Sequence, residues 1–391
     1  MVERAYFDWN ATAPLRPQAA AALRDASALT GNPSSVHAEG RAARRAVEEA
    51  REQVAALLGA RPADVIFTSG GTEANCLALS PAIEVVGDKA PRDRLLISAI
   101  EHPSVRAGAR FAPEVIEDIP VESDGRVDLT ALADAVARAA RPLVSIMLAN
   151  NETGVVQPVA AAAAIVHAAG GLLHVDAVQA AGRIPCDIGA LGADLLTLSA
   201  HKIGGPKGVG ALVRARDDIH FPAPLIRGGG QERGLRAGTE NVAGIAGFGA
   251  AAAIAREKLA DEAAHMLALR KELEAGICAI APQAVILGAG AERLPNTTLF
   301  ALAGLKAETA IIAFDLEGIA VSSGAACSSG KVQPSHVLEA MGVSPVLVRS
   351  AVRASLGWTT TKADIERFLS AWRKVSSALS KGSKERPGIA A

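Results

Sequence analysis

Two hydrophobic patterns alternate along the first two thirds of the chain. Apolar residues recur at helical spacing in 17–29 and 38–59, and the second segment ends at a glycine after two leucines. Short, continuous apolar runs follow at 64–69, 94–99, 143–149, 171–176 and 194–199. Continuous runs of this kind are typical of strands that are buried on both faces. The pattern therefore predicts an α/β fold with a mostly parallel, mixed sheet covered by helices.

The pattern changes near residue 260. A charged helix over 261–280 is followed by shorter apolar strands at 296–303 and 319–322 and then by further helices. With 391 residues, half of them apolar, the chain is long enough for two cores. We expect three parts: an N-terminal arm (1–14) packing with the small domain, a large domain (15–260) and a smaller C-terminal α+β domain (261–391).

Charge and composition restrict the classes of function. Lysine plus arginine (40) nearly balance aspartate plus glutamate (41), and aromatic residues make up only 3%. Direct binding of nucleic acid is therefore not expected, because it usually needs a basic surface or aromatic stacking. Neither a secretory signal pattern nor an apolar run long enough for a membrane span is present, so a cytoplasmic location is expected. Four cysteines without CxxC spacing argue against a disulfide framework and a zinc site.

Polar residues collect where the predicted strands end, the edge at which open α/β sheets bind ligands. In chain order they are Gly71 and Thr72 at a helix start, His102, Asn151, Asp176 with Gln179, and the turn Ser199-Ala-His-Lys202. Each signal is weak alone, since a turn lysine is usually solvated and a lone histidine is usually structural. No Gly-Lys-Ser/Thr ending or GxGxxG motif opens a helix, which disfavours a nucleotide. Pyridoxal phosphate would use all of these groups. It needs a lysine for the Schiff base, an acid at the pyridine nitrogen, a helix N-terminus for the phosphate and a flat side chain over the ring.

The order and spacing of the motifs resemble those of a known family. Further matching segments are Phe7-Asp-Trp-Asn-Ala-Thr-Ala-Pro14, Gly31-Asn-Pro-Ser-Ser35, Asn150-Asn-Glu-Thr-Gly154, Arg236-Ala-Gly-Thr-Glu-Asn241 and Val321-Ser-Ser-Gly-Ala-Ala-Cys-Ser-Ser329. The chain is similar to fold-type I pyridoxal-phosphate enzymes of the class V aminotransferase group, and within it to cysteine desulfurases of the NifS/IscS kind. The sequence before Cys327 resembles the first group of these enzymes, with Ala325 where many members have serine.

The resemblance implies a role in cofactor binding for each matching residue. Lys202 would be the Schiff-base lysine, Asp176 would pair with the pyridinium nitrogen, and His102 would stack on the ring and assist proton transfer. Gln179 would hydrogen-bond the ring oxygen, and Asn151 would contact cofactor and substrate. The phosphate site implied in the same way comprises Gly71, Thr72, Ser199, Ala200 and His201, together with Thr239 of the neighbouring subunit. A homodimer with active sites at its interface follows from the role of Thr239.

Substrate chemistry, on the same resemblance, depends on Arg353 and Cys327. Arg353 would hold the α-carboxylate of L-cysteine in a bidentate pair, and Asn32 and Asn151 would also contact the substrate. Lys202 would remove the α-proton, and the Cys327 thiolate would take the sulfur as a persulfide, leaving L-alanine. The sulfur would pass to iron–sulfur scaffold or other acceptor proteins. Cys327 is also a candidate for a transient iron–sulfur ligand.

Cys327 differs from the other three cysteines in its sequence surroundings. It stands in a small, polar, glycine-containing stretch that predicts an exposed loop, whereas Cys76 and Cys278 lie in apolar helical patterns and Cys186 lies in a turn. We interpret those three as inert core residues. Another class V enzyme, such as an aminotransferase or a selenocysteine lyase, would share the cofactor residues without needing Cys327. A non-enzymatic sulfur scaffold would be expected to lack either Cys327 or Lys202, and both are present.

Overall fold

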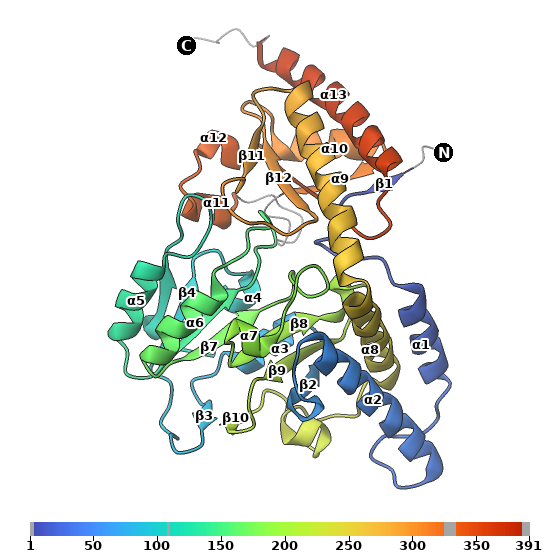
Figure 1. The fold of residues 1–391 in the computed structure, drawn as a ribbon, viewed down its shortest axis with the longest axis vertical. Helices are drawn as coiled ribbons and strands as arrows, with labels where there is room; N and C mark the ends of the chain where they lie inside the picture. The colour runs from blue at the N-terminus through green and yellow to red at the C-terminus, as the bar shows by residue number, and fades with distance from the viewer. Residues whose placement is uncertain (1–3, 108–109, 324–333, 385–391) are drawn as a thin grey trace, which may run out of the picture.

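The computed structural model describes residues 4–107, 110–323 and 334–384. Figure 1 shows two parts along the long axis, a larger one around a seven-stranded sheet and a smaller one around a four-stranded sheet. The first strand, β1 (Ala5–Tyr6), pairs in parallel with β13 (Ile319–Ala320) beside the smaller sheet. The N-terminal segment therefore lies against the C-terminal part of the chain. The domain boundaries at residues 14 and 260 stay predictions.

The large sheet has the strand order β2-β9-β8-β7-β6-β4-β5. Its strands are β2 (Val65–Thr68), β4 (Arg94–Ser98), β5 (Ile116–Ile119), β6 (Pro142–Met147), β7 (Leu172–Asp176), β8 (Leu195–Ser199) and β9 (Gly210–Arg214). β9 runs antiparallel to both of its neighbours, and the other neighbouring pairs run parallel. The predicted mixed, mostly parallel sheet is thus confirmed. The hydrophobic pattern did not predict β9 or the half-exposed edge strand β5.

Alternate residues of the central strands pack into different cores, which explains their continuous apolar sequences. Leu96 and Val144 belong to one core, whereas their neighbours Leu95 and Leu143 belong to the core on the other face. Helices of the first core are α1 (Pro17–Ser27), α2 (Ala38–Leu57), α5 (Leu129–Ala137), α6 (Val159–Ala168) and α8 (Val242–Glu257); those of the second are α3 (Gly71–Ala78) and α4 (Pro103–Arg106). Burial on both faces leaves no position for a solvated side chain within a strand. Chemistry is therefore confined to the strand ends.

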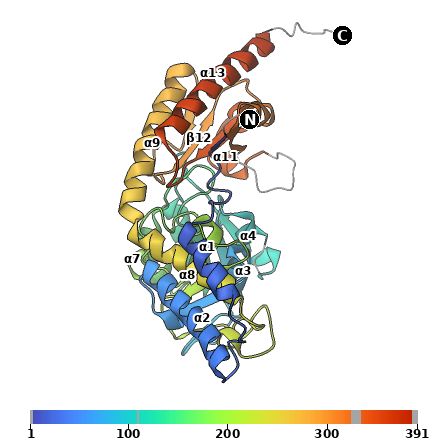
Figure 2. The same cartoon turned by 90° about the vertical axis from the view of Figure 1, so that its right-hand side faces the viewer.

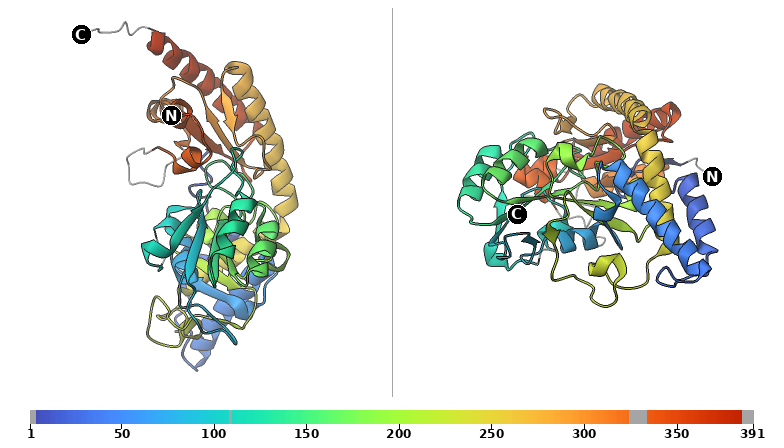
Figure 3. Two further views of the ribbon diagram at one scale, coloured as in Figure 1. Left: turned by 90° about the vertical axis from the view of Figure 1, so that its left-hand side faces the viewer. Right: turned by 60° about the horizontal axis from the view of Figure 1, so that its bottom comes forward.

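The small sheet has the order β11-β12-β15-β14 and is antiparallel. Its strands are β11 (Val285–Leu287), β12 (Thr297–Ala301), β14 (Ser322–Ser323) and β15 (Ala351–Ser355), and its helices are α9 (Leu259–Ile280), α10 (Ala307–Leu316) and α13 (Lys362–Lys384). Buried aromatic rings, among them Phe300, Phe368 and Trp372, form the core between sheet and helices. In Figures 2 and 3, α9 runs along one side of the molecule and joins the two parts.

Two predicted elements end or divide differently in the structure. The strand predicted at 319–322 belongs to two sheets, because β13 pairs with β1 whereas β14 pairs with β15. The parallel partner of β13 is β1, at the other end of the chain, and the local sequence pattern cannot predict that pairing. The helix predicted at 38–59 ends at Leu57, because Gly59 adopts a left-handed φ of 63° that closes the helix end.

Short elements complete the described chain. They are β3 (Glu84–Val85), β10 (Ile219–His220), α7 (Ile188–Leu191), α11 (His336–Ala340), α12 (Pro345–Val348) and the 3₁₀ turns η1 (Pro62–Asp64), η2 (Pro113–Val115), η3 (Ala200–Lys202) and η4 (Gln231–Gly234). Within the described ranges, no helix has the length and apolar character needed to cross a membrane.

Candidate active site

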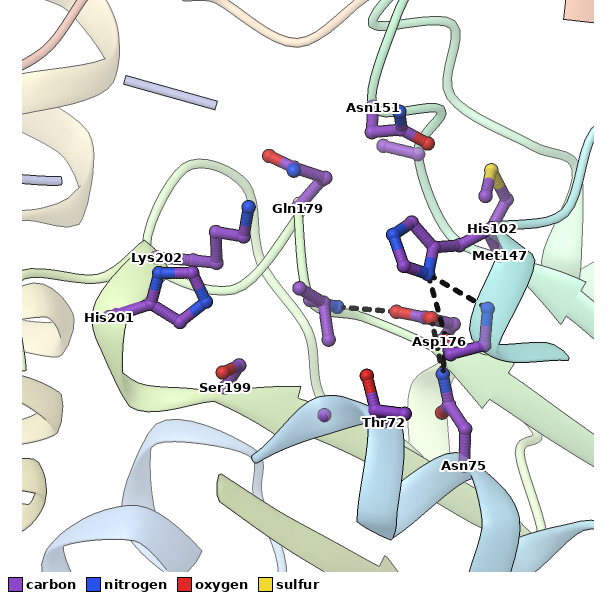
Figure 4. A pocket seen from close by; sticks show the side chains of 14 residues that line it. Thr72, Asn75, His102, Met147, Asn151, Asp176, Gln179, Ser199, His201 and Lys202 are labelled. Atoms are coloured by element: carbon purple, nitrogen blue, oxygen red, sulfur yellow. Dashed lines mark hydrogen bonds between the residues drawn. The ribbon is translucent and has the colours of Figure 1, made fainter. Parts of the chain in front are cut away.

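A cavity of about 220 Å³ lies at the carboxyl edge of the parallel strands (Figure 4). Its lining residues are Gly71, Thr72, Asn75, His102, Ser104, Met147, Ala149, Asn151, Asp176, Val178, Gln179, Ser199, His201 and Lys202. They come from the start of α3 and from the ends of β4, β6, β7 and β8 and the segments that follow them. The structure thus brings together the predicted cofactor residues apart from Ala200 and Thr239.

Asp176 ends β7 on the floor of the cavity and is only 5% exposed. Its Oδ1 accepts a hydrogen bond from the Val178 amide at 2.9 Å, and its Oδ2 accepts one from Asn75 Nδ2 at 2.9 Å. The Asn75 amide is oriented in turn, because its Oδ1 accepts from the Thr197 hydroxyl while Nδ2 also donates to Ser104 Oγ at 2.9 Å. The two donors fix the direction of this buried carboxylate.

His102 extends over Asp176 in Figure 4 and caps the start of α4. Its Nδ1 accepts a hydrogen bond from the Ser104 amide at 3.1 Å, so a neutral ring carries its proton on Nε2. Burial lowers the pKa of His102, the charges of Lys202 and His336 lower it further, and Asp176 opposes them. His102 is therefore a neutral imidazole near pH 7, with Nε2–H as its donor.

Lys202 ends the 3₁₀ turn that follows β8 and approaches the cavity from the side opposite His102 (Figure 4). Its Nζ donates to the backbone oxygens of Asn10 and Ala11, the latter at 2.8 Å. Asn10 is 1% exposed and joins both parts of the fold, since its Nδ2 donates to Asn151 O at 3.2 Å and to Thr297 Oγ1 at 3.0 Å. The N-terminal segment thus fixes the position of the lysine amine.

The start of α3 forms a cradle for an anion. A Cβ atom added at Gly71 would lie 3.0 Å from Val178 Cγ2 and 3.5 Å from Ser199 Cβ, so a side chain there would crowd the cavity. The free amides of a helix N-terminus attract negative charge, and Thr72 and Ser199 add hydroxyl groups beside them. His201 is a neutral neighbour, because burial and then Lys202 lower its pKa to about 4.

Arg353 brings the small sheet to the edge of this site. It lies on β15, is 3% exposed, and donates from Nη1 to Asn151 O and from Nη2 to Asp8 Oδ1, both at 2.9 Å. Its Nε has no hydrogen-bond partner within the described part of the chain. A buried guanidinium with an unused donor next to Asn151 is suited to a carboxylate ligand.

Glu101 is a buried acid that the sequence reasoning did not single out. Its Oε1 accepts from the Met147 amide, and its Oε2 has no hydrogen-bond partner among the described residues. Burial, reinforced by the negative charge of Asp176, raises the pKa of Glu101 well above its usual value. The signal was available, because a charged residue two positions after a predicted buried strand has to be explained.

Four predicted residues lie elsewhere. Asn32 is exposed between α1 and α2, where its Oδ1 accepts from the Ser34 amide. Thr239 is exposed and lines a separate cavity with Arg236. Ala200 is fully buried directly beneath the site, and Cys327 lies outside the described residues.

The three described cysteines only partly match their predicted burial. Cys186 is buried, which raises the pKa of its thiol to about 12, whereas Cys76 and Cys278 are half-buried on α3 and α9. The predicted core position is therefore wrong for the two helical cysteines, each of which is only half-buried. Among the described residues, no group of three or more His, Cys, Asp or Glu side chains is arranged to hold a metal ion.

The residues of the cavity fit pyridoxal phosphate. Asp176 is directed to accept a hydrogen bond from a ring nitrogen, the glycine start of α3 leaves room for a phosphate, and Lys202 supplies an amine. The fold and this site together define a pyridoxal-phosphate enzyme of fold type I.

The chain belongs to the class-V aminotransferase family, whose model matches residues 5–368. It is 45% identical to a cysteine desulfurase of Cereibacter sphaeroides over 374 residues, which cover 94% of both chains. It is 40% identical to an IscS-like cysteine desulfurase of Mycobacterium tuberculosis, over 93% of this chain and 94% of that one. The solved structure of a NifS-like protein from Rickettsia africae superposes with a TM-score of 0.85 at 37% identity, over 96% of this chain and 100% of that one.

Proposed function

We propose that this protein is a pyridoxal-phosphate-dependent cysteine desulfurase, which converts L-cysteine to L-alanine and transfers the sulfur to an acceptor. The observation that carries the proposal is one cavity in which Lys202, Asp176 and His102 meet, with the buried Arg353 bonded to Asn151 at its edge. Its relatives at 40–45% identity over most of both chains bear the name cysteine desulfurase, which supports the same activity.

The chain's own residues would hold the cofactor and move one proton. When bound, pyridoxal phosphate supplies an electron sink for the negative charge that develops at the substrate α-carbon. Asp176 would bind the ring nitrogen, Gln179 the ring oxygen, and His102 would cover one face of the ring. The phosphate would lie among Gly71, Thr72, Ser199 and His201, with the fully buried Ala200 between the last two along the chain. Lys202 would take the α-proton at Nζ, which Asn10 and Ala11 direct toward the cavity.

On the substrate side, Arg353 would bind the α-carboxylate of L-cysteine, with Asn151 as a further contact; the exposed Asn32 lies outside the cavity of its own subunit. Arg353 already holds Asp8, so the substrate carboxylate would share or replace that partner. The Cys327 thiolate would then attack the substrate sulfur, and the Cβ–S bond would break with its electron pair on Cβ, which takes a proton to give alanine. The sulfur would remain on Cys327 as a persulfide. Iron–sulfur scaffold or thiolation proteins in the cytoplasm would receive it, and transient cluster ligation by Cys327 belongs to the same proposal.

The test is a product analysis with L-cysteine as substrate. Purified holoenzyme with a thiol reductant should form alanine and sulfide in equal amounts, and D-cysteine serves as the matched control substrate. An aminotransferase would instead consume L-cysteine only with a 2-oxo acid and would release no sulfide. That second outcome would reject the desulfurase assignment while leaving the cofactor assignment intact.

Asn75 is expected to affect cofactor affinity without touching the reacting atoms. Asp176 accepts hydrogen bonds from Asn75 and from the Val178 amide, and Asn75→Leu removes the first of them. A hydrogen bond to a charged group contributes about 1.5–3 kcal/mol of free energy. Titration of the apoenzyme should therefore show about tenfold or more weaker binding of pyridoxal phosphate. Gln157→Leu is a matched control, since that buried amide bonds Val127 and Gly125 away from the cavity. Wild-type affinity in Asn75→Leu would contradict this role.

A homodimer belongs to the proposed function. Thr239 is exposed in its own subunit and does not line the main cavity, which is consistent with a role at the phosphate of a neighbouring subunit. Light scattering on the holoenzyme should give a mass of twice the 39.9 kDa chain. A mass of one chain would remove the role given to Thr239.

A further inference from the structure

Arg183 is a buried cation that the proposed chemistry leaves without a role. It lies in the segment after β7 and is 5% exposed. Within the described residues, its guanidinium forms no ion pair, and burial together with the nearby charge of Arg353 lowers its pKa to about 9. A buried charge without a counter-charge is costly, so the contacts that retain it need an explanation.

The contacts of Arg183 converge on Gln179. Nη1 donates to the backbone oxygen of Gln179 at 2.7 Å and also to its side-chain Oε1. Nη2 makes a longer contact, 3.4 Å, to the backbone oxygen of Trp9. All three acceptors are neutral, and two of them belong to one glutamine that lines the cavity.

These contacts determine which way the Gln179 amide faces. A guanidinium only donates, so the atom that faces Arg183 has to be the oxygen. A backbone carbonyl only accepts, so the atom 3.0 Å from Asn10 O has to be Nε2. The two constraints are independent and agree, which settles an orientation that is otherwise ambiguous for an amide.

The same arrangement connects Arg183 to the catalytic lysine. Asn10 O accepts from Gln179 Nε2 and also from Lys202 Nζ. Nε2 carries two hydrogens, and only one is needed for Asn10. The second remains for an acceptor in the cavity that Gln179 lines (Figure 4).

We propose that Arg183 is a positioning residue that holds the Gln179 amide with Nε2 as a donor toward an anionic ring oxygen of the cofactor. The proposal rests on the cofactor role given above to Gln179. If Arg183 is lost, only the hydrogen bond from Nε2 to Asn10 O still opposes a half-turn of the amide, and in the turned amide Oε1 faces that ring oxygen. The donated hydrogen bond is thereby replaced by repulsion between two oxygens.

The visible absorption band of the bound cofactor reports this hydrogen bond through its pH titration. The bound cofactor titrates by losing the proton that its ring oxygen shares with the lysine-bound nitrogen. A hydrogen-bond donor to the ring oxygen stabilises the deprotonated form more than the protonated form. Loss of the donor therefore raises the pH at the midpoint of the titration. In Arg183→Met the midpoint should rise by about one pH unit. Arg183→Lys keeps the charge without the planar fork and should shift the midpoint less, in the same direction. Arg92→Met is the matched control, because Arg92 is similarly buried but bonds Ile83 and Asp88, neither of which lines the cavity.

A double-variant comparison separates positioning from simple charge. In a Gln179→Leu background, adding Arg183→Met should shift the midpoint little further, because Arg183 then has no amide to orient. An equal shift with and without Gln179 would overturn the proposal and show that the charge alone acts. His102, Asp176, His201, Lys202 and Arg353 face the site and remain unchanged in every variant.

The remaining outcomes are also decisive. If Arg183→Met does not fold, the Arg183→Lys shift and its loss in the Gln179→Leu background carry the test. An unchanged midpoint in both Arg183 variants would overturn the proposal. A wild-type protein with no visible band after reconstitution would instead reject the cofactor assignment itself.

Discussion

A Lys202→Ala variant is expected to lack the visible absorption band after reconstitution with pyridoxal phosphate and to lose turnover by about 10³-fold or more. Lys202 is the lysine that lines the cavity, and its Nζ is held there by Asn10 and Ala11. Removing it takes away both the covalent attachment of the cofactor and the base for the α-proton. The measurement is an absorption spectrum together with alanine formation from L-cysteine.

The control for this variant is Lys271→Ala on the exposed face of α9. It should keep the band and the activity, since it changes a lysine without approaching the cavity. A Lys202→Ala protein with a wild-type spectrum would mean that another amine holds the cofactor. In that case the roles of Lys202 and of its N-terminal contacts would both be wrong.

A Cys327→Ala variant is expected to keep the visible band while sulfide and alanine formation from L-cysteine falls by about 100-fold, which corresponds to about 2.7 kcal/mol of activation free energy. The thiolate that would accept the sulfur is missing, whereas the groups that bind the cofactor are intact. Mass spectrometry after one turnover should find an extra sulfur on the wild-type Cys327 and none on the variant.

Cys278→Ala is the matched control, because it removes a half-buried thiol on α9 away from the cavity. It should form the persulfide and turn over as the wild type does. If Cys327→Ala released sulfide as fast as the wild type, the persulfide role would be rejected. The cofactor site and the desulfurase activity would stand, and the substrate sulfur would have to be accepted by a group other than Cys327.

Much of the large domain follows from local sequence. Leu95 and Leu96 belong to cores on opposite faces of the sheet, and that double burial is what makes the strand apolar throughout. The strand ends then have to carry the polar groups, so Asp176 and Lys202 were predictable as neighbours at one edge. The edge strand β5 could not be predicted from the sequence, because it is half-exposed and therefore lacks a continuous apolar run.

Other parts of the site have no local signal. Asn10 accepts from Lys202 across 192 positions, and Arg353 donates to Asn151 across 202 positions. Each is an ordinary polar residue in its own segment. Only the pairing of β1 with β13 and the packing of the small sheet over the large one bring them to the cavity.

By itself, the sequence determined the α/β class, the strand-end residues and, through its motifs, the family to which the chain belongs. These are properties of short segments, where hydrophobic period and side-chain chemistry are read directly. The tertiary structure decided which of those residues share one cavity, that His102 and His201 are neutral there, and that Arg183 orients Gln179. Those features depend on burial and on hydrogen bonds between distant segments, and neither exists until the chain has folded.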